Sequence, residues 1–211
     1  MSRSFTVLLL LAEVLGLAAC EQMQQARNTY NAVASTARAA KNAGAAMQAA
    51  AQKRTDRAQR GDTLSLNYRE LQRYLPTEVN GYAAVGRPKG ESVNLSGMSY
   101  STCEQDYEKN GQRLKIQLVD YNGANALYAG ATAMMSAGFS QENDEQLMRG
   151  CDLGVSGVKG WETLEKKEGK ACVALGVGDR FFVAVESDRQ RDTEFVKQVA
   201  RNLDLQALAK L

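Results

Sequence analysis

The chemistry open to this 211-residue chain is limited first by a residue type that it lacks, because it contains no histidine. Without an imidazole the chain cannot form a Ser-His-Asp or Cys-His catalytic site, nor bind zinc through histidine. Carboxylates and cysteine thiols are the remaining candidates for acid–base or nucleophilic chemistry. The four cysteines form no C-x-x-C pair, which argues against a thioredoxin-like redox site. We therefore expect no catalytic residue, no metal site and no cofactor.

Three cysteines follow Cys20, namely Cys103, Cys151 and Cys172. In an oxidising compartment they could form one disulfide and leave one thiol. Cys151 stands in the turn-like segment Gly150-Cys151-Asp152, whereas the other two fall in strand-like runs. Because a loop cysteine reaches partners more easily, we expect a disulfide of Cys151 with Cys103 or Cys172. Three buried free thiols are the alternative.

Other motifs have simple structural interpretations. Asp120-Tyr121-Asn122-Gly123 reads as a turn, because Asn-Gly tolerates positive φ, and Asp179-Arg180 as a hairpin turn. Glu142-Asn143-Asp144-Glu145 lacks the ligand spacing of a calcium loop and reads as a solvated loop. Trp161, the only tryptophan, is expected in the core or as a lid over the sheet end.

The first twenty residues have a different character. One positive charge in the first four residues precedes an apolar run from Phe5 to Leu17, and small residues follow. A basic start, a short apolar core and small residues before a cut are typical of a secretory signal. The core is shorter than the roughly 20 residues that a spanning helix needs.

The end of this signal, Leu17-Ala18-Ala19-Cys20, resembles the lipobox of bacterial lipoproteins. The resemblance implies that the Cys20 sulfur receives a diacylglyceryl group, that signal peptidase II removes residues 1–19, and that the new amine is acylated, as with palmitate. Glu13, inside the apolar core, departs from the pattern. In lipoproteins of enterobacteria an Asp after the cysteine favours the inner membrane, and this chain has Glu21 there, so the resemblance implies the outer membrane, facing the periplasm.

The charge balance narrows the choice of partners. The full chain has a formal net charge of +2, and residues 1–19 contain one Arg and one Glu, so cleavage leaves the balance unchanged. A nearly neutral chain is a poor electrostatic binder of nucleic acid. The partner that the sequence does indicate is the membrane, through the lipid at Cys20.

Residues 20–61 are expected to form a lipid-anchored helical stalk. Alanine, the strongest helix former, occupies 11 of the 20 positions from 32 to 51. Small and apolar residues follow heptad spacing, as in a coiled coil, which leaves two interpretations open. The stalk either forms a homo-oligomer through residues 21–60 or is a solvated helical spacer.

Residues 62–211 are expected to form one globular domain of the α+β class. Amphipathic helices are predicted at 64–75, 124–137 and 193–210, with strand-like runs between them. The strand-like runs include a short one at 81–86 and an alternating one at 114–118, and hairpin turns are predicted at 167–169 and 178–180. Strand links of hairpin length indicate an antiparallel sheet with helices packed on it.

These features predict an envelope lipoprotein whose domain is a non-catalytic binding or interaction module. Its partner, an envelope protein or a small ligand, is left open. Two alternatives belong to other classes: a structural stalk that oligomerises, and a histidine-free envelope enzyme that uses a cysteine or a carboxylate. One reactive thiol of low pKa would favour the enzyme.

Overall fold

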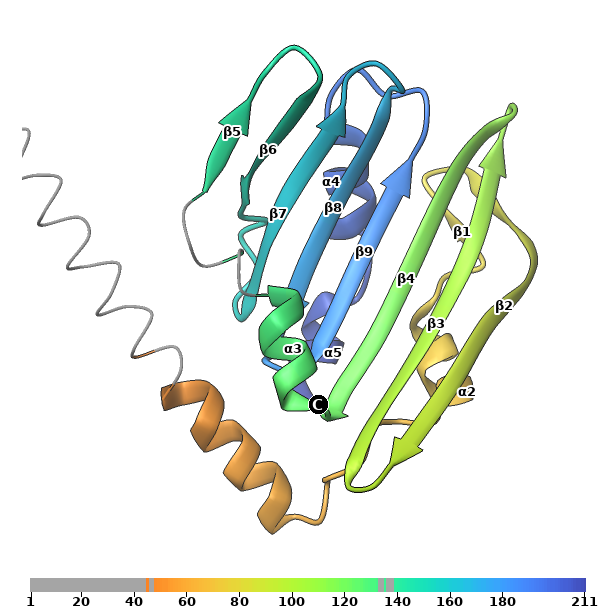
Figure 1. Ribbon diagram of the computed structural model, residues 1–211. Coiled ribbons are helices and arrows are strands. Elements are labelled where there is room, and N and C mark those ends of the chain that lie inside the picture. The colour runs from red at the N-terminus through yellow and green to blue at the C-terminus, as the bar shows by residue number, and fades with distance from the viewer. Residues whose placement is uncertain (1–44, 46–47, 133–134, 136–138) are drawn as a thin grey trace, which may run out of the picture. The chain divides into compact units, whose positions relative to one another are not determined.

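A computed structural model describes residues 45, 48–132, 135 and 139–211 of the chain. The chain divides into two compact units, Met1–Gln52 and Lys53–Leu211. Most of the first unit lies outside the described residues, including the signal, Cys20 and most of the expected stalk. The architecture described below is that of Lys53–Leu211 (Figure 1).

Nine antiparallel strands form a single sheet in the order β1-β2-β3-β4-β9-β8-β7-β6-β5. Most neighbours in the sheet are also neighbours in the chain, so tight turns connect them. The exception is β4 beside β9, because β5 to β8 are inserted between these two strands in sequence. The strands are β1 Glu78–Val79, β2 Tyr82–Leu95, β3 Met98–Lys109, β4 Gln112–Gly123, β5 Ser140–Glu142, β6 Gln146–Cys151, β7 Val158–Glu165, β8 Lys170–Val177 and β9 Phe181–Ser187.

The helices are short, and they cover the two faces of the sheet unequally (Figure 1). On one face lie α2 (Tyr68–Leu71), α4 (Glu194–Arg201) and α5 (Leu205–Lys210), with the 3-10 turn η1 (Gln72–Tyr74) continuing α2. The other face carries α3 (Asn125–Thr132) near one end. Residues 48–59 are also helical. We call the first face the covered face and the second the open face.

The hydrophobic core lies between the covered face and its helices. Alternate residues of each central strand point to this side, as the two-residue period of a strand requires. They meet the apolar faces of the helices, with the side chains of Asn67 and Asp204 capping α2 and α5. The buried residues include Leu71, Leu114, Ile116, Leu118, Val173, Leu175, Val177, Phe181, Val183, Val185, Val196, Val199, Leu205 and Leu208.

The expected fold class, an α+β domain of packed helices preceded by a long helix, is wrong. Strands dominate the described chain and the helices in it are few and short. The sequence pattern indicated only 81–86 as strand where β2 runs to Leu95, because most of β2 is exposed and its apolar residues do not alternate. The expected helix at 193–210 is broken at 202–204 into α4 and α5. In the described part of the chain, no helix is long and apolar enough to cross a membrane.

The second compact unit begins at Lys53, and Arg57 belongs to it. The Arg57 guanidinium donates to Asn122 Oδ1 over 2.8 Å and to Asp179 Oδ2 over 3.2 Å. The residues just before the sheet are therefore fixed to the ends of β4 and β9. Residues 21–44 and 46–47 of the expected stalk, with most of its heptads, lie outside the described residues.

Candidate functional site

The open face is the part of the domain that the fold leaves available to a partner. Apart from Gln117, its middle is apolar and shallow, since Val119, Ala174 and Gly176 are buried while Phe182 and Ala184 are partly exposed. These residues sit side by side on β4, β9 and β8, as the register of the three strands shows. The open face therefore has a shallow apolar floor of small and aromatic residues.

At one end, α3 closes this floor. A Cβ atom at Gly176 would lie 2.8 Å from Tyr128 Oη and 3.0 Å from Thr132 Cγ2, so glycine lets α3 approach the sheet. Tyr121 packs edge-on against Tyr128 with ring centroids 6.3 Å apart. Trp161 also lies on this face, beside Ala174, and is partly exposed rather than part of the core.

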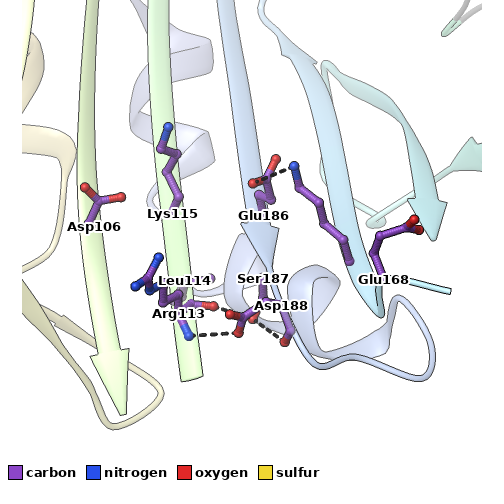
Figure 2. Close-up of a pocket in the computed structure, with 9 residues that line it drawn as sticks. Asp106, Arg113, Leu114, Lys115, Glu168, Glu186, Ser187 and Asp188 are labelled. Atoms are coloured by element: carbon purple, nitrogen blue, oxygen red, sulfur yellow. Dashed lines mark hydrogen bonds and ion pairs between the residues drawn. The ribbon is translucent and has the colours of Figure 1, made fainter. Parts of the chain in front are cut away.

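At the other end, a charged groove of about 400 Å³ crosses β3, β4, β9 and β8. Figure 2 shows Asp106, Lys115 and Glu186 projecting from neighbouring strands into the same space. The groove is lined by acidic and basic residues in nearly equal number, with two further residues: Asp106, Arg113, Leu114, Lys115, Glu168, Lys170, Glu186, Ser187 and Asp188.

Cross-strand ion pairs hold most of the charges in the groove. Lys115 Nζ lies 3.2 Å from Glu104 Oε2, and Lys170 Nζ lies 3.1 Å from Glu186 Oε1. Lys89 approaches Glu104 more loosely, at 3.7 Å. Such exposed pairs contribute little to stability, roughly 0–1 kcal/mol each, so a partner can exchange them for its own charges at low cost.

The base of the groove is rigid because side chains fix its backbone. Asp188 Oδ1 accepts the Arg113 backbone N–H over 2.9 Å, and Ser187 Oγ donates to the Arg113 carbonyl over 2.8 Å. Among the described residues, the Arg113 guanidinium has no ion pair within 4.0 Å. It is therefore a cation on a fixed backbone that can meet a carboxylate or phosphate.

The sequence motif at Asp120 was interpreted wrongly as a turn, because the segment continues β4 up to Gly123. The Arg180 guanidinium donates a hydrogen bond to each carboxylate oxygen of Asp120, both over 2.8 Å. Asp120 is 0% exposed and Arg180 2% exposed, and Arg180 Nη1 also reaches Asp62 Oδ2 at 3.0 Å. This cluster of Asp120, Arg180 and Asp62 fixes the segment that precedes the sheet to the ends of its strands. Its role is therefore structural rather than catalytic.

A second buried carboxylate, Glu162, lies on the covered face. Lys197 Nζ of α4 stands 2.9 Å from Glu162 Oε2, and Arg149 of β6 bonds the other oxygen. Burial raises the pKa of Glu162, but hydrogen bonds from Lys197, Arg149 and Thr193 together outweigh it and lower the pKa below its usual range. This carboxylate is ionised and paired, so it is not set up as a general acid.

The structure does not form the expected disulfide, and its three described cysteines are free. Cys103 on β3 and Cys151 on β6 are separated by four strands, or about 24 Å at the spacing of a sheet. Cys172 on β8 points to the opposite face from Cys151, with β7 between them. A disulfide needs Cα atoms within about 7 Å, so neither pairing is compatible with this fold.

We expect the three thiols to be unreactive in the folded protein. Burial raises the pKa of Cys103 to about 12 and those of Cys151 and Cys172 to about 11, so almost no thiolate forms at neutral pH. In a Cys20→Ser variant, which keeps only these three thiols, a thiol reagent should count no fast-reacting group in native buffer and three groups after unfolding. A single fast-reacting thiol in the native protein would favour the alternative of a histidine-free enzyme. A count of only one thiol after unfolding would reveal a disulfide between the other two.

The acidic segment 142–145 lies at the end of β5, and two of its carboxylates form ion pairs with lysines. Glu142 belongs to β5 and pairs with Lys166 Nζ at 2.9 Å, while Glu145 pairs with Lys167. Lys166 lowers the pKa of Glu142 through this hydrogen bond. In the part of the chain that the structure describes, no three Cys, Asp or Glu side chains are grouped to hold a metal ion.

The open face was not identified from the sequence. Lys115 and Gln117 alternate with core residues in β4, a signal that one side of this strand is polar. The sequence does not indicate which residues of β8 lie on the open face, because Lys170–Val177 is almost continuously buried and shows no alternation of polar and apolar residues. Only the register of β8 with β9 assigns Ala174 and Gly176 to the open face.

The fold and this site define a class: a nine-stranded antiparallel sheet with helices packed on one face and a largely open second face. The sequence matches no family model and no curated protein, so no relative supplies an activity or a ligand.

Proposed function

We propose that this chain is a lipid-anchored lipoprotein of the cell envelope whose sheet domain is a non-catalytic binding module. The lipid is attached at Cys20, and the domain works at the outer membrane, facing the periplasm. The observation that carries the proposal is the open face, with an apolar floor between α3 and the charged groove. An antiparallel sheet with one packed and one open face presents a rigid surface to a partner.

The composition of the open face supports binding over catalysis. The partly exposed Phe182 and Ala184 of its floor offer apolar contact, and its groove offers charges of both signs for orientation. Few convergent polar groups around an apolar surface are typical of a binding site. The histidine-free enzyme has less support, since burial raises the pKa of all three described thiols.

A photo-crosslinking amino acid at Gln117, in the middle of the open face, tests the proposal in intact envelopes. Gln117 pairs with Ala184 and is only partly buried, so a larger side chain fits there. The matched control is Gln198, exposed on α4 behind the covered face. We expect a specific adduct from position 117 alone. Equal adducts from both positions, or none from position 117, would overturn the open face as the binding surface.

Anchoring has a separate test. Cys20→Ser should abolish labelling with a fatty acid and cleavage by signal peptidase II, because the thiol is the acceptor of the lipid. The single substitution Cys172→Ser, in the domain, is the control and should leave labelling unchanged. Labelling that survives Cys20→Ser would contradict the lipoprotein assignment.

A further inference from the structure

One corner of the domain gathers most of the exposed large apolar side chains. Six such residues occur in the described part of the chain, and four of them are leucines at this corner. Their exposed fractions are 65% for Leu64, 62% for Leu95, 44% for Leu127 and 38% for Leu211. Single exposed leucines need no explanation, but four on one corner do.

A hydrogen bond and the strand pairing place Leu64, Leu95 and Leu127 near the end of β4. The Leu64 carbonyl accepts Asn122 Nδ2 over 3.0 Å, near the end of β4. Ser99, just after the β2–β3 turn that follows Leu95, is paired with Gly123 in β4, and α3 with Leu127 begins two residues later. Figure 1 shows the β2–β3 turn, the end of β4, the start of α3 and the C-terminus at the same end of the sheet.

The same corner is free of charge along two segments. Residues 92–103, which form the β2–β3 turn and its flanks, contain no charged residue, and neither do residues 121–132, which include α3. Three tyrosines from these segments pack in a row, with Tyr121 tilted against Tyr100 and edge-on to Tyr128, and the ring centroids of both pairs are 6.3 Å apart. The opposite ends of β3 and β4 carry the charged groove instead.

We propose that this leucine corner, defined by Leu64, Leu95, Leu127 and Leu211 with the three tyrosines, is a membrane-contact surface that enters the interface of a phospholipid bilayer. Leucine side chains gain free energy by leaving water, and tyrosine favours the level of the lipid headgroups. A segment without charges avoids the cost of placing an ion there.

A bilayer is the occupant because the chain reaches the domain at this corner. Arg57 bonds Asn122 at the end of β4, and so places residues 53–60 beside the leucines. Arg57 itself is buried and paired with Asp179, but the segment also carries Lys53, Arg54 and Arg60 against Asp56, a positive excess that suits anionic headgroups. The proposed lipid at Cys20, which precedes this segment in the sequence, would tether the domain to a bilayer. This choice of occupant rests on the proposed function.

Flotation with vesicles tests the corner without the anchor. We would use the chain from Glu21 onward, which lacks Cys20, and vesicles of phosphatidylethanolamine and phosphatidylglycerol. The double variant Leu95→Glu/Leu127→Glu should bind at least about tenfold more weakly, since it loses apolar contact and adds charge. The control Val85→Glu changes a residue that is 50% exposed on the same strand as Leu95 but away from the corner, and should bind normally.

Tryptophan fluorescence tests the same contact without the double variant, which could bind weakly only because it misfolds. In a Trp161→Phe background, Leu95→Trp places the only tryptophan at the corner, and its emission should shift to the blue and be quenched by brominated lipids. Val85→Trp in the same background should show neither effect. Equal behaviour of the two reporters, or no vesicle binding by the unaltered chain, would overturn the membrane contact. Lipid labelling at Cys20 would be unaffected by that result, so the two proposals fail separately.

Discussion

Replacing Arg180 by methionine is expected to lower the free energy of unfolding by about 3–5 kcal/mol. Arg180 is the only described cation on Asp120, a carboxylate that is 0% exposed, and it bonds both oxygens at 2.8 Å. Methionine fills a similar volume but leaves Asp120 as a buried charge whose hydrogen bonds come from Leu66 and Asn122 backbone N–H groups alone. The loss arises from the unpaired charge rather than from lost packing.

Urea unfolding followed by circular dichroism measures the change, and Lys115→Met is the matched control. Lys115 also forms a salt bridge, with Glu104 at 3.2 Å, but it is exposed and should cost less than about 1 kcal/mol. Adding Asp120→Asn to Arg180→Met should recover part of the stability, because the buried charge is removed. Equal losses of unfolding free energy from Arg180→Met and Lys115→Met would show that the buried pair of Arg180 and Asp120 stabilises the fold no more than a surface salt bridge does.

The same cluster joins the first part of the domain to its last. Arg180 reaches Asp62 in the incoming segment and the carbonyl of Leu211 at 3.4 Å, while Asn122 holds Arg57 and Asp62. A weakened cluster would therefore also loosen the leucine corner. For this reason Arg180 variants are unsuitable for testing membrane contact, and surface substitutions at Leu95 and Leu127 are preferred.

Local signals allowed some elements to be predicted from the sequence. The turns at Lys167–Gly169 and at Gly178–Arg180 do connect antiparallel pairs, β7 with β8 and β8 with β9. Both turns contain a glycine with positive φ, a requirement that is visible in the residue type. The strand in β4 was visible because Leu114, Ile116 and Leu118 alternate with polar residues.

The size of the sheet and its open face could not be predicted in this way. Most of β2 is exposed on both sides, so its 14 residues give no alternation, and β8 is buried throughout its second half. The partner of Asp120 lies 60 residues away in sequence, at Arg180, and only the pairing of β4 with β9 brings the two together. Contacts of this range depend on strand order, which short patterns do not encode.

Removing the cation beside the buried Glu162 carboxylate is the second substitution expected to destabilise the fold strongly. Replacing Lys197 by methionine should lower the free energy of unfolding by about 3 kcal/mol near neutral pH. Lys197 Nζ lies 2.9 Å from Glu162 Oε2, and Glu162 is 2% exposed. Arg149 remains on the other oxygen, but its side chain is 49% exposed and cannot replace the Lys197 ammonium, whose side chain is only 12% exposed. Gln198→Met, on the exposed side of α4, is the control and should change little.

The pH dependence of this loss identifies its cause. The pKa of Glu162 in the folded protein lies below its usual value of about 4.3, so its pairing stabilises the fold at any pH above that value. This contribution disappears as the pH falls through the lowered pKa, because the unfolded chain takes up the proton first. The difference between Lys197→Met and the unaltered protein should therefore be largest near pH 7 and shrink below about pH 4. A difference that stays constant with pH would mean that Lys197 acts through packing of its methylene chain and not through the Glu162 carboxylate.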